Sequence, residues 1–278
     1  MIIDFHTHLL PPSFGERREE IAAKDRTFAA LFADPKSKIA NHDELLAAMN
    51  EDGVDMSVAL GFGWTDAEVA RESNDYLLKA AGASNGRIIA FCSIDPSWGD
   101  DALSEVKRCV AAGARGIGEL HPSTQGTKLA TDRGLAHIME FAEQEDLPVV
   151  VHGSEPVGHD YPGKGHTYPR DILAMATRFP NVKIVAAHWG GGLPFYAHMP
   201  EVRKALANVY FDSAATPFLY DQSVFSTVAS AIGPGRMLFG SDFPLLNAKR
   251  VAEIAIADLT PAYAGMFLGE NARGLLKE

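Results

Sequence analysis

Short apolar stretches rich in β-branched residues recur along the chain, and longer stretches of mixed character separate them. The apolar stretches cover residues 2–8, 54–62, 87–95, 114–121, 148–153, 182–190, 209–214 and 236–243. Amphipathic stretches that read as helices lie between several of them, at 42–53, 67–85, 101–113, 133–146 and 168–181. This alternation predicts βα units and a parallel sheet.

Eight such units fit a single (β/α)8 TIM-type barrel that occupies residues 1–278 as one domain. A doubly wound open sheet is the alternative, because alternation alone does not prove that the sheet closes. Two connections, 9–41 and 153–169, exceed the usual length of about 2 to 6 residues. Both follow strands, so in a barrel both stand on the face where active sites form, and we expect them to wall the pocket.

Histidines and carboxylates stand at the ends of five of the apolar stretches. His6 and His8 are two residues apart on a predicted strand, so their side chains point to the same face. A lone histidine at a strand end is commonly a hydrogen-bonded structural residue. A structural role does not readily explain histidines or carboxylates at the ends of five strands. Burying these groups together is costly without a cation to compensate them. The sequence therefore predicts a metal site built from some or all of His6, His8, Glu119, His152, His188 and Asp242, with His121 at the same strand end as Glu119.

The ligand types indicate which metal and which chemistry to expect. Imidazole and carboxylate without cysteine suit zinc and also accept manganese, iron, cobalt or nickel. We expect one or two zinc ions first. Zinc held by three or four protein ligands keeps a position for water and lowers the pKa of that water to about 7. Such a site can hydrolyse a substrate at neutral pH.

Composition and charge narrow the choice of partners. Hydrophobic residues are 46% and charged residues 22% of the chain, as in a globular protein with a large core. The formal net charge of −11 would repel nucleic acid and anionic membranes, so we expect neither and favour a small-molecule substrate. Cys92 and Cys109 are the only cysteines, and neither a leader nor a run of about 18 apolar residues occurs. We expect a cytoplasmic protein without disulfides, and a homo-oligomer stays open.

Five motifs together resemble the amidohydrolase superfamily, in particular its amidohydrolase-related branch. They are HTH at 6–8, VHG at 151–153, AHWGGG at 187–192, FGSDFP at 239–244 and LGENARGLL at 268–276. The resemblance implies that His6, His8, His152 and Asp242 hold the metal and that Asp242 also accepts a proton from the attacking water. It places His188 beside the metal, where it polarises a substrate oxygen or binds a second ion. The branch includes aminocarboxymuconate semialdehyde decarboxylase, aromatic-acid decarboxylases and lactone hydrolases.

Glu119 departs from the pattern of the single-metal decarboxylases, which do not use a glutamate from the fourth strand as a ligand. Two-metal amidohydrolases carry a modified lysine or a glutamate there, which bridges their ions. The segment GIGELHP also resembles the GE element of metal-dependent deoxyribonucleases, but the acidic charge fits that branch poorly. We expect Glu119 to bind metal. The alternative is that it accepts a hydrogen bond from a ligand histidine and orients it.

Candidate substrate contacts come from the two predicted pocket walls and from residues beside the strand ends. Aromatic surface with a few polar groups is typical of small-molecule pockets. The candidates are Trp64, His121, Tyr161, Lys164, His166 and Trp189. Asp95 and Asp212 also end strands, and we expect them to serve turn hydrogen bonds.

The leading functional hypothesis is a hydrolase that directs metal-activated water at a carbonyl carbon of an ester, lactone or amide of a small organic acid. The alternative is a metal-dependent, non-oxidative decarboxylase of an aromatic or muconate-type acid, in which His188 and Asp242 handle protons. A metal-binding scaffold without catalysis would require a blocked water position or the loss of Asp242, and Asp242 is present.

Overall fold

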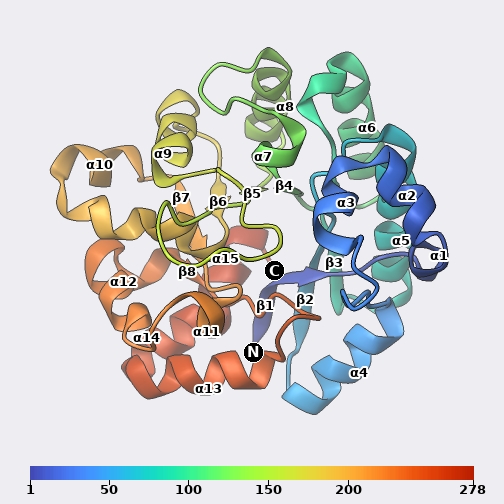
Figure 1. The fold of residues 1–278 in the computed structure, drawn as a ribbon. Helices are drawn as coiled ribbons and strands as arrows, with labels where there is room; N and C mark the ends of the chain where they lie inside the picture. The colour runs from blue at the N-terminus through green and yellow to red at the C-terminus, as the bar shows by residue number, and fades with distance from the viewer.

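The structure, a computed structural model, describes residues 1–278 and has an α/β fold with eight parallel strands. Each predicted apolar stretch contains one strand, and nearly all strand residues are buried, as expected for parallel strands covered by helices. The strands are β1 Ile3–His8, β2 Met56–Leu60, β3 Ile88–Ala90, β4 Ile117–Leu120, β5 Val149–Val151, β6 Ile184–Ala186, β7 Val209–Asp212 and β8 Met237–Leu238. Helices lie around the strands, which occupy the centre of the molecule in Figure 1.

The strands form two sheets, of order β1-β2-β3 and β4-β5-β6-β7-β8, that meet at both of their edges. On one side the Cys92 amide donates to the Gly116 carbonyl at 3.0 Å. On the other side the Phe5 amide donates to Phe239 at 2.7 Å, and the amide of His8 donates to Phe243 at 2.8 Å. These bonds place residues of β1 beside the segment that follows β8.

The two strands that carry the first predicted ligands are irregular at those ligands. The pairing of β1 with β2 shifts register between Asp4 and Thr7, which flank His6. The pairing of β4 with β5 shifts between Ile117 and Leu120, which flank Glu119. A shift of this kind changes the direction in which a side chain points.

The five predicted amphipathic stretches form helices, and ten further helices lie in the connections between strands and after β8. Asn41 caps α4 by accepting from the amides of Asp43 and Glu44, and Gly53 ends it in the left-handed conformation. The helices are α1 Pro12–Glu16, α2 Arg18–Lys24, α3 Arg26–Phe32, α4 His42–Asp52, α5 Ala67–Ala83, α6 Asp100–Ala111, α7 Pro122–Gln125, α8 Arg133–Gln144, α9 Pro169–Arg178, α10 Pro200–Ala205, α11 Thr216–Leu219, α12 Val224–Ile232, α13 Ala248–Asp258, α14 Pro261–Gly265 and α15 Asn271–Leu276. None is long and apolar enough to span a membrane.

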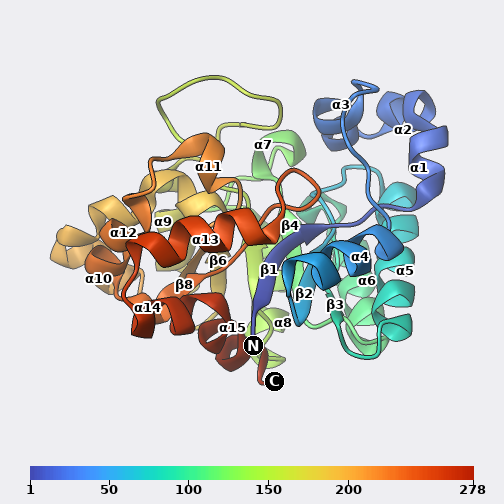
Figure 2. The same ribbon diagram turned by 90° about the horizontal axis from the view of Figure 1, so that it is seen from below.

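The two long connections differ in structure. The first contains α1, α2 and α3, whose apolar side chains Phe14, Phe28 and Phe32 pack with Trp64. The second connects β5 to α9 without regular secondary structure, and we call residues 153–168 the strand-five loop. In Figure 2 this loop projects beyond the helices, on the same side of the molecule as α2 and α3. Both connections therefore stand where the strands end, as predicted.

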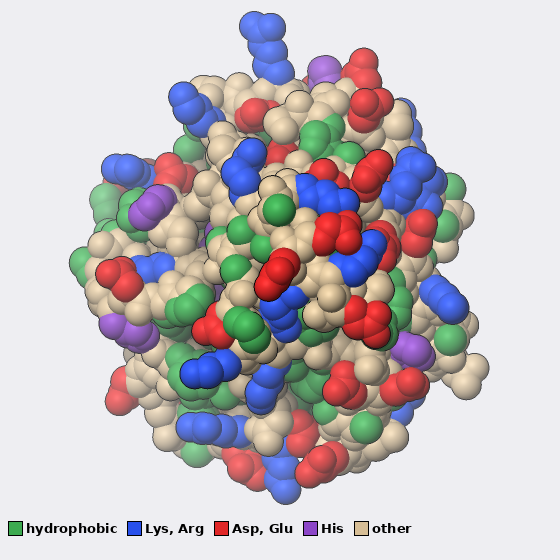
Figure 3. All heavy atoms as spheres, turned by 45° about the vertical axis from the view of Figure 1, so that its right-hand side comes forward, with side chains coloured by type: hydrophobic (Ala, Val, Ile, Leu, Met, Phe, Trp, Pro, Cys, Tyr) green, Lys and Arg blue, Asp and Glu red, His purple; other side chains and the backbone are tan.

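Charged side chains cover the surface in mixed order. On the face shown in Figure 3, Lys and Arg side chains alternate with Asp and Glu side chains. This face has no broad basic area of the kind that grips a nucleic-acid backbone.

Candidate metal centre

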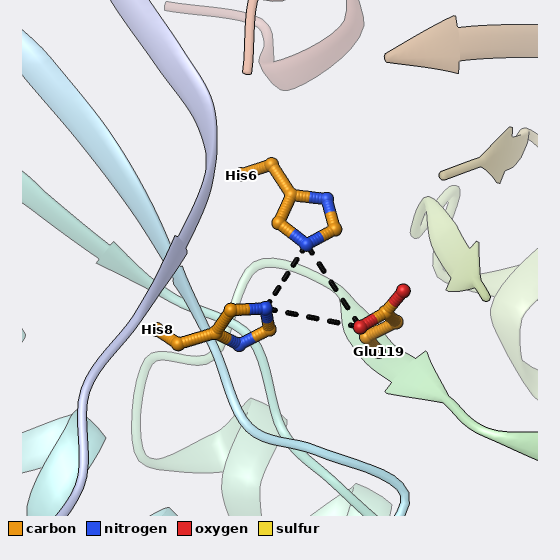
Figure 4. A group of neighbouring side chains, drawn as sticks. All are labelled: His6, His8 and Glu119. Carbon is orange, nitrogen blue, oxygen red and sulfur yellow. Dashed lines mark hydrogen bonds and ion pairs between the residues drawn. The ribbon is translucent and has the colours of Figure 1, made fainter. Parts of the chain in front are cut away.

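Two histidines of β1 and one glutamate of β4 meet at the centre of the carboxyl ends of the strands (Figure 4). The Nε2 atoms of His6 and His8 lie 3.0 Å apart. Glu119 Oε2 lies 3.8 Å from each of them. All three side chains are almost completely buried. Ligands about 2.1 Å from one zinc ion are separated by distances of this size in tetrahedral geometry.

The hydrogen bonds made by the Nδ1 atoms of His6 and His8 determine the tautomer of each ring, and so the state of each Nε2 atom. His6 Nδ1 donates to the Asp212 carboxylate at 2.9 Å, and His8 Nδ1 donates to the Leu60 carbonyl at 3.3 Å. Both partners only accept hydrogen bonds, so each Nδ1 carries the hydrogen and each Nε2 presents a lone pair. Two lone pairs that face each other at 3.0 Å, next to a carboxylate, repel unless a cation lies between them. The donor set therefore fits a divalent metal ion.

The other oxygen of Glu119 faces a second pair of histidines. Oε1 lies 3.0 Å from His152 Nδ1 and 3.5 Å from His188 Nε2. His188 Nδ1 donates to the Ala214 carbonyl at 3.1 Å, so its Nε2 also presents a lone pair. His152 Nε2 is buried and has no hydrogen-bond partner, although buried polar atoms are rarely left so. Glu119 thus belongs to two groups of side chains that could hold an ion.

Asp242 reaches the same centre from the segment that follows β8. Its Oδ1 lies 3.7 Å from His6 Nε2 and 3.4 Å from His8 Nε2. Its own amide donates to the His6 carbonyl at 2.9 Å, and the residue has a left-handed φ of 67°. The backbone contact between the two ends of the fold therefore brings this carboxylate to the histidines of β1.

The carboxylates make the histidine nitrogens strong binders of positive charge. Burial lowers the pKa of His6, but Asp212, Glu119 and Asp242 outweigh burial and raise this pKa to about 9. Burial also opposes the charge on His188, and Glu119 with Asp242 raises its pKa to about 10. Burial raises the pKa of Asp242, but the neighbouring imidazole of His8 and the charge of His6 bring it down to about 2. A proton and a metal cation compete for the same lone pairs.

A cavity of about 590 Å³ opens onto this centre. His8, Glu119, His152, His188 and Asp242 form its floor. The Phe62 ring stacks on the His8 ring, with centroids 3.9 Å apart. The walls are mainly apolar and come from α3, the segment that follows it, the segment after β2, the strand-five loop, α11 and the segment after Asp242. They include Leu31, Phe32, Phe62, Tyr161, Phe218, Leu219 and Leu245. Lys36 and Lys38 are the lysines at the wall. A flat apolar acid fits such a space.

Only some of the predicted substrate residues reach this cavity. Tyr161 and His121 line it. His121 stacks on His152, with ring centroids 4.4 Å apart. Burial, followed by the charge of His152, lowers the pKa of His121 to about 4, so its ring is neutral at pH 7.

Trp64, Trp189, His166 and Lys164 do not line this cavity. Trp64 is fully buried among the phenylalanines of α1 and α3. Trp189 is fully buried against Phe225 and donates to Thr216 Oγ1 at 2.9 Å. His166 is exposed and pairs with the Tyr168 hydroxyl. Lys164 Nζ turns back onto carbonyls of its own loop. Aromatic and polar residues near strand ends serve packing and loop structure as often as binding.

Two residues of the site were missed in the sequence. Asp212 was expected to serve turn hydrogen bonds, and its Oδ1 does accept from the amides of His188 and Ala214. Its Oδ2, however, holds His6, which gives it a direct role in orienting a candidate ligand. Its position at the end of β7, in line with the other strand-end ligands, was the available signal. Phe62 offered no signal beyond its place after β2.

The sequence is similar to one protein family and to several known proteins. The amidohydrolase family profile matches residues 3–277. A 2-amino-3-carboxymuconate-6-semialdehyde decarboxylase of Dictyostelium discoideum is 23% identical over 87% of this chain and 81% of its own length. A 6-methylsalicylic acid decarboxylase of Penicillium expansum is 25% identical over 71% of this chain and 69% of its own length.

Solved structures share the fold. The 5-carboxyvanillate decarboxylase of Sphingomonas paucimobilis superposes with a TM-score of 0.76 at 17% identity, covering 99% of this chain and 98% of its own. That of Novosphingobium aromaticivorans, solved with manganese, gives a TM-score of 0.78 at 16% identity, covering 100% of this chain and 96% of its own.

The leading hypothesis of a hydrolase is wrong. The named relatives are decarboxylases, and so are several proteins of the same fold, in agreement with the alternative stated above. The error has a chemical reason, because one set of histidine and carboxylate ligands serves both reactions and what the ion binds, water or substrate, separates them. The profile match over nearly all of its residues shows that the chain belongs to the amidohydrolase family.

Proposed function

We propose that the protein is a metal-dependent, non-oxidative decarboxylase of an aromatic or muconate-type acid. The observation that carries the proposal is the cavity, which joins mainly apolar walls to a floor of histidines and carboxylates. Apolar walls suit a conjugated ring or diene, and a cation held by the floor would suit the carboxylate group that is lost as carbon dioxide. The reactions named for the relatives have substrates of this class.

The proposed metal ligands are His6, His8, Glu119, His152, His188 and Asp242, of which the first three and Asp242 surround one point. Zinc fits these nitrogen and oxygen donors, and manganese is bound in two structures of the same fold. A divalent ion held here would supply positive charge that binds oxygen atoms of the substrate. Asp212 holds His6 in the tautomer that this arrangement needs.

Apolar side chains of the cavity orient the substrate, and two of the proposed ligands also move one proton. The bond between the carboxylate carbon and the neighbouring carbon breaks, carbon dioxide leaves, and the electron pair left behind takes up one proton. We assign this proton transfer to His188 and Asp242, which both line the cavity. Phe62, Phe32 and Leu219 hold the apolar part of the substrate and exclude water from it.

The scaffold required for this function is one closed barrel. The backbone bonds between Phe5 and Phe239 and between Cys92 and Gly116 support closure of the two sheets. We propose that residues 1–278 form one domain of this kind, with the metal centre at the carboxyl ends of the strands.

The test is a screen of the zinc- and manganese-loaded protein against 6-methylsalicylate, 2,6-dihydroxybenzoate, 5-carboxyvanillate and 2-amino-3-carboxymuconate semialdehyde. We expect carbon dioxide and the decarboxylated product in equal amounts from at least one of them. Asp242→Asn should abolish the release, whereas Gly274→Ala, on the exposed side of α15, should retain it. Acid production from lactones or esters without any carbon dioxide release would overturn the proposal.

A further inference from the structure

The strand-five loop starts next to His152, and its middle part lines the cavity. At its start, Gly191 (φ 64°) approaches the Ser154 carbonyl so closely that any Cβ would collide with it. Further along, His159, Tyr161, Pro162 and Gly163 line the cavity. At Gly163 the loop approaches Leu31 of α3, which lies on the opposite wall. The loop therefore extends across the cavity, as a cover.

One side chain of this loop joins it to a third wall. The Tyr161 hydroxyl donates to Glu155 Oε2 at 2.9 Å, and the Tyr220 hydroxyl donates to Glu155 Oε1 at 2.8 Å. Tyr220 directly follows α11, whose Phe218 and Leu219 line the cavity. Burial, followed by the charge of Glu155, raises the pKa of both tyrosines, so both hydroxyls keep the proton they donate.

Glu155 itself stands apart from the chemistry. It does not line the cavity, and neither of its oxygens is bonded to a histidine of the metal centre. Hydrogen bonds to a charged acceptor are stronger than those between neutral groups. A half-buried carboxylate that accepts from two walls of a cavity therefore contributes to the position of both.

The loop is also joined to the metal centre through His121. Its Nε2 donates to the Gly163 carbonyl at 3.1 Å, while its ring stacks on His152. The amide of His166 donates to Ser123 Oγ at 2.5 Å. These contacts hold the loop at Gly163 and His166, and Glu155 holds it at Tyr161.

We propose that Glu155 is a positioning residue that, through Tyr161 and Tyr220, holds the strand-five loop closed over the substrate cavity. The inference rests on the proposed decarboxylase function for its effect on substrate binding, but the closed loop itself does not depend on that function. Opening of the loop admits substrate, and closure presses Tyr161 against it. Loss of Glu155 therefore weakens substrate binding more than it slows the chemical step.

The loop contains its own reporter of opening. Lys164 Nζ is bonded to the carbonyls of Val157 and His159, and its side chain is only 14% exposed. Trypsin can cleave after Lys164 only when the loop opens, so the cleavage rate follows the open population. Tyr220→Phe keeps the ring and removes the hydrogen bond to Glu155, which joins the loop to α11. We expect cleavage between Lys164 and Gly165 to become about tenfold faster in this variant and in Glu155→Ala.

Two further variants serve as a rescue and as a control in the cleavage measurement. Glu155→Gln keeps a carbonyl acceptor and should restore most of the protection that Glu155→Ala loses. Tyr263→Phe removes an exposed hydroxyl on α14, away from the cavity, and should leave cleavage unchanged. An unchanged cleavage rate in Tyr220→Phe and Glu155→Ala would overturn the proposal.

A second experiment measures steady-state kinetics with whichever of the four acids named under Proposed function is decarboxylated. We expect Tyr220→Phe to raise KM about tenfold with kcat within about twofold of wild type and with unchanged zinc content. A lowered melting temperature without any change in KM would show a purely structural role and overturn the positioning role. If no acid is decarboxylated but the cleavage rates change as expected, the proposed function fails and the closed loop stands.

Discussion

His6 and Asp212 form a fully buried hydrogen bond of 2.9 Å between residues 206 positions apart in sequence. It joins the end of β1 to the end of β7 and sets the tautomer of His6. The inner nitrogen of His6 faces His8, Glu119 and Asp242 for this reason. Asp212 thus acts on the metal centre without facing it.

The first prediction follows from this bond. Asp212→Asn keeps the shape of the side chain but removes the charge that orients and polarises His6. We expect zinc affinity to fall by about 10- to 100-fold, the usual effect of removing such a partner. A competition titration with a chelator measures it. Asp101→Asn, on the exposed face of α6, is the control. Equal affinity in Asp212→Asn and wild type would show that the bond does not support the site.

The second prediction concerns Glu119, which belongs to both candidate ligand groups. Glu119→Gln keeps the volume and removes the negative charge that offsets the bound cations. We expect the metal content of the purified protein, measured by elemental analysis, to fall by close to one ion per chain, and turnover to fall with it. Glu140→Gln, on the exposed side of α8, should retain full metal content. If Glu119→Gln kept the wild-type metal content, Glu119 would act only by orienting His152.

The third prediction concerns acid stability and a buried carboxylate remote from the cavity. Burial raises the pKa of Glu105, but hydrogen bonds from Arg108 and Asn74 outweigh burial and lower this pKa to about 2. A pKa lower in the folded than in the unfolded state stabilises the fold above the unfolded value, and this contribution is lost as pH falls through the folded value.

We therefore expect Glu105→Gln to lower the free energy of unfolding by about 1 to 3 kcal/mol at pH 7. The difference from wild type should shrink as pH falls from about 5 towards 2. Urea unfolding of both metal-free proteins at several pH values measures it, and the comparison cancels acid effects common to the two. A difference that stayed constant over this range would contradict the assigned pKa.

The fourth prediction concerns the contact between Gly191 and the start of the strand-five loop. Ala at this position would adopt a left-handed φ and collide with the Ser154 carbonyl. We expect Gly191→Ala to destabilise the protein by at least about 2 kcal/mol. Gly274→Ala, whose Cβ meets nothing within 4 Å, should be neutral or stabilise by up to about 1 kcal/mol. Thermal unfolding of the two variants gives the comparison, and equal stability would refute the close approach.

The strands and the candidate metal ligands could be predicted from sequence because both follow simple rules. Buried parallel strands are runs of Val, Ile and Ala, and the carboxyl ends of such strands meet at one face. His152 and Asp242 were predicted as ligands from their positions at the ends of such strands. Proximity to a strand end does not say which way a side chain points, and Trp64 and Trp189 do not line the cavity. Trp64 instead packs against Phe14 of α1 and against Phe28 and Phe32 of α3.

The reaction could not be predicted from the ligands, because the ion's neighbours in the cavity decide it. Phe62, Leu219 and Tyr161 come from three different connections, and their convergence on one space depends on the tertiary fold. Glu155 is a further example. Nothing in its local sequence distinguishes it, and only the fold brings Tyr220 to it from 65 positions away.

The contact between β1 and the segment after β8 also sets the order of events during synthesis. The amide of Ser241 donates to Asp4 across 237 positions, and Asp242 contacts His6 in the same place. On the ribosome, β1 emerges first, yet it cannot pair on this side until residues 239–243 have been made. Closing so long a stretch of chain is slow, because the entropy of the intervening residues is lost before the contact forms. Truncated chains that stop before Asp242 expose one edge of β1 and its two histidines, which makes them targets for chaperones and for stray metal ions.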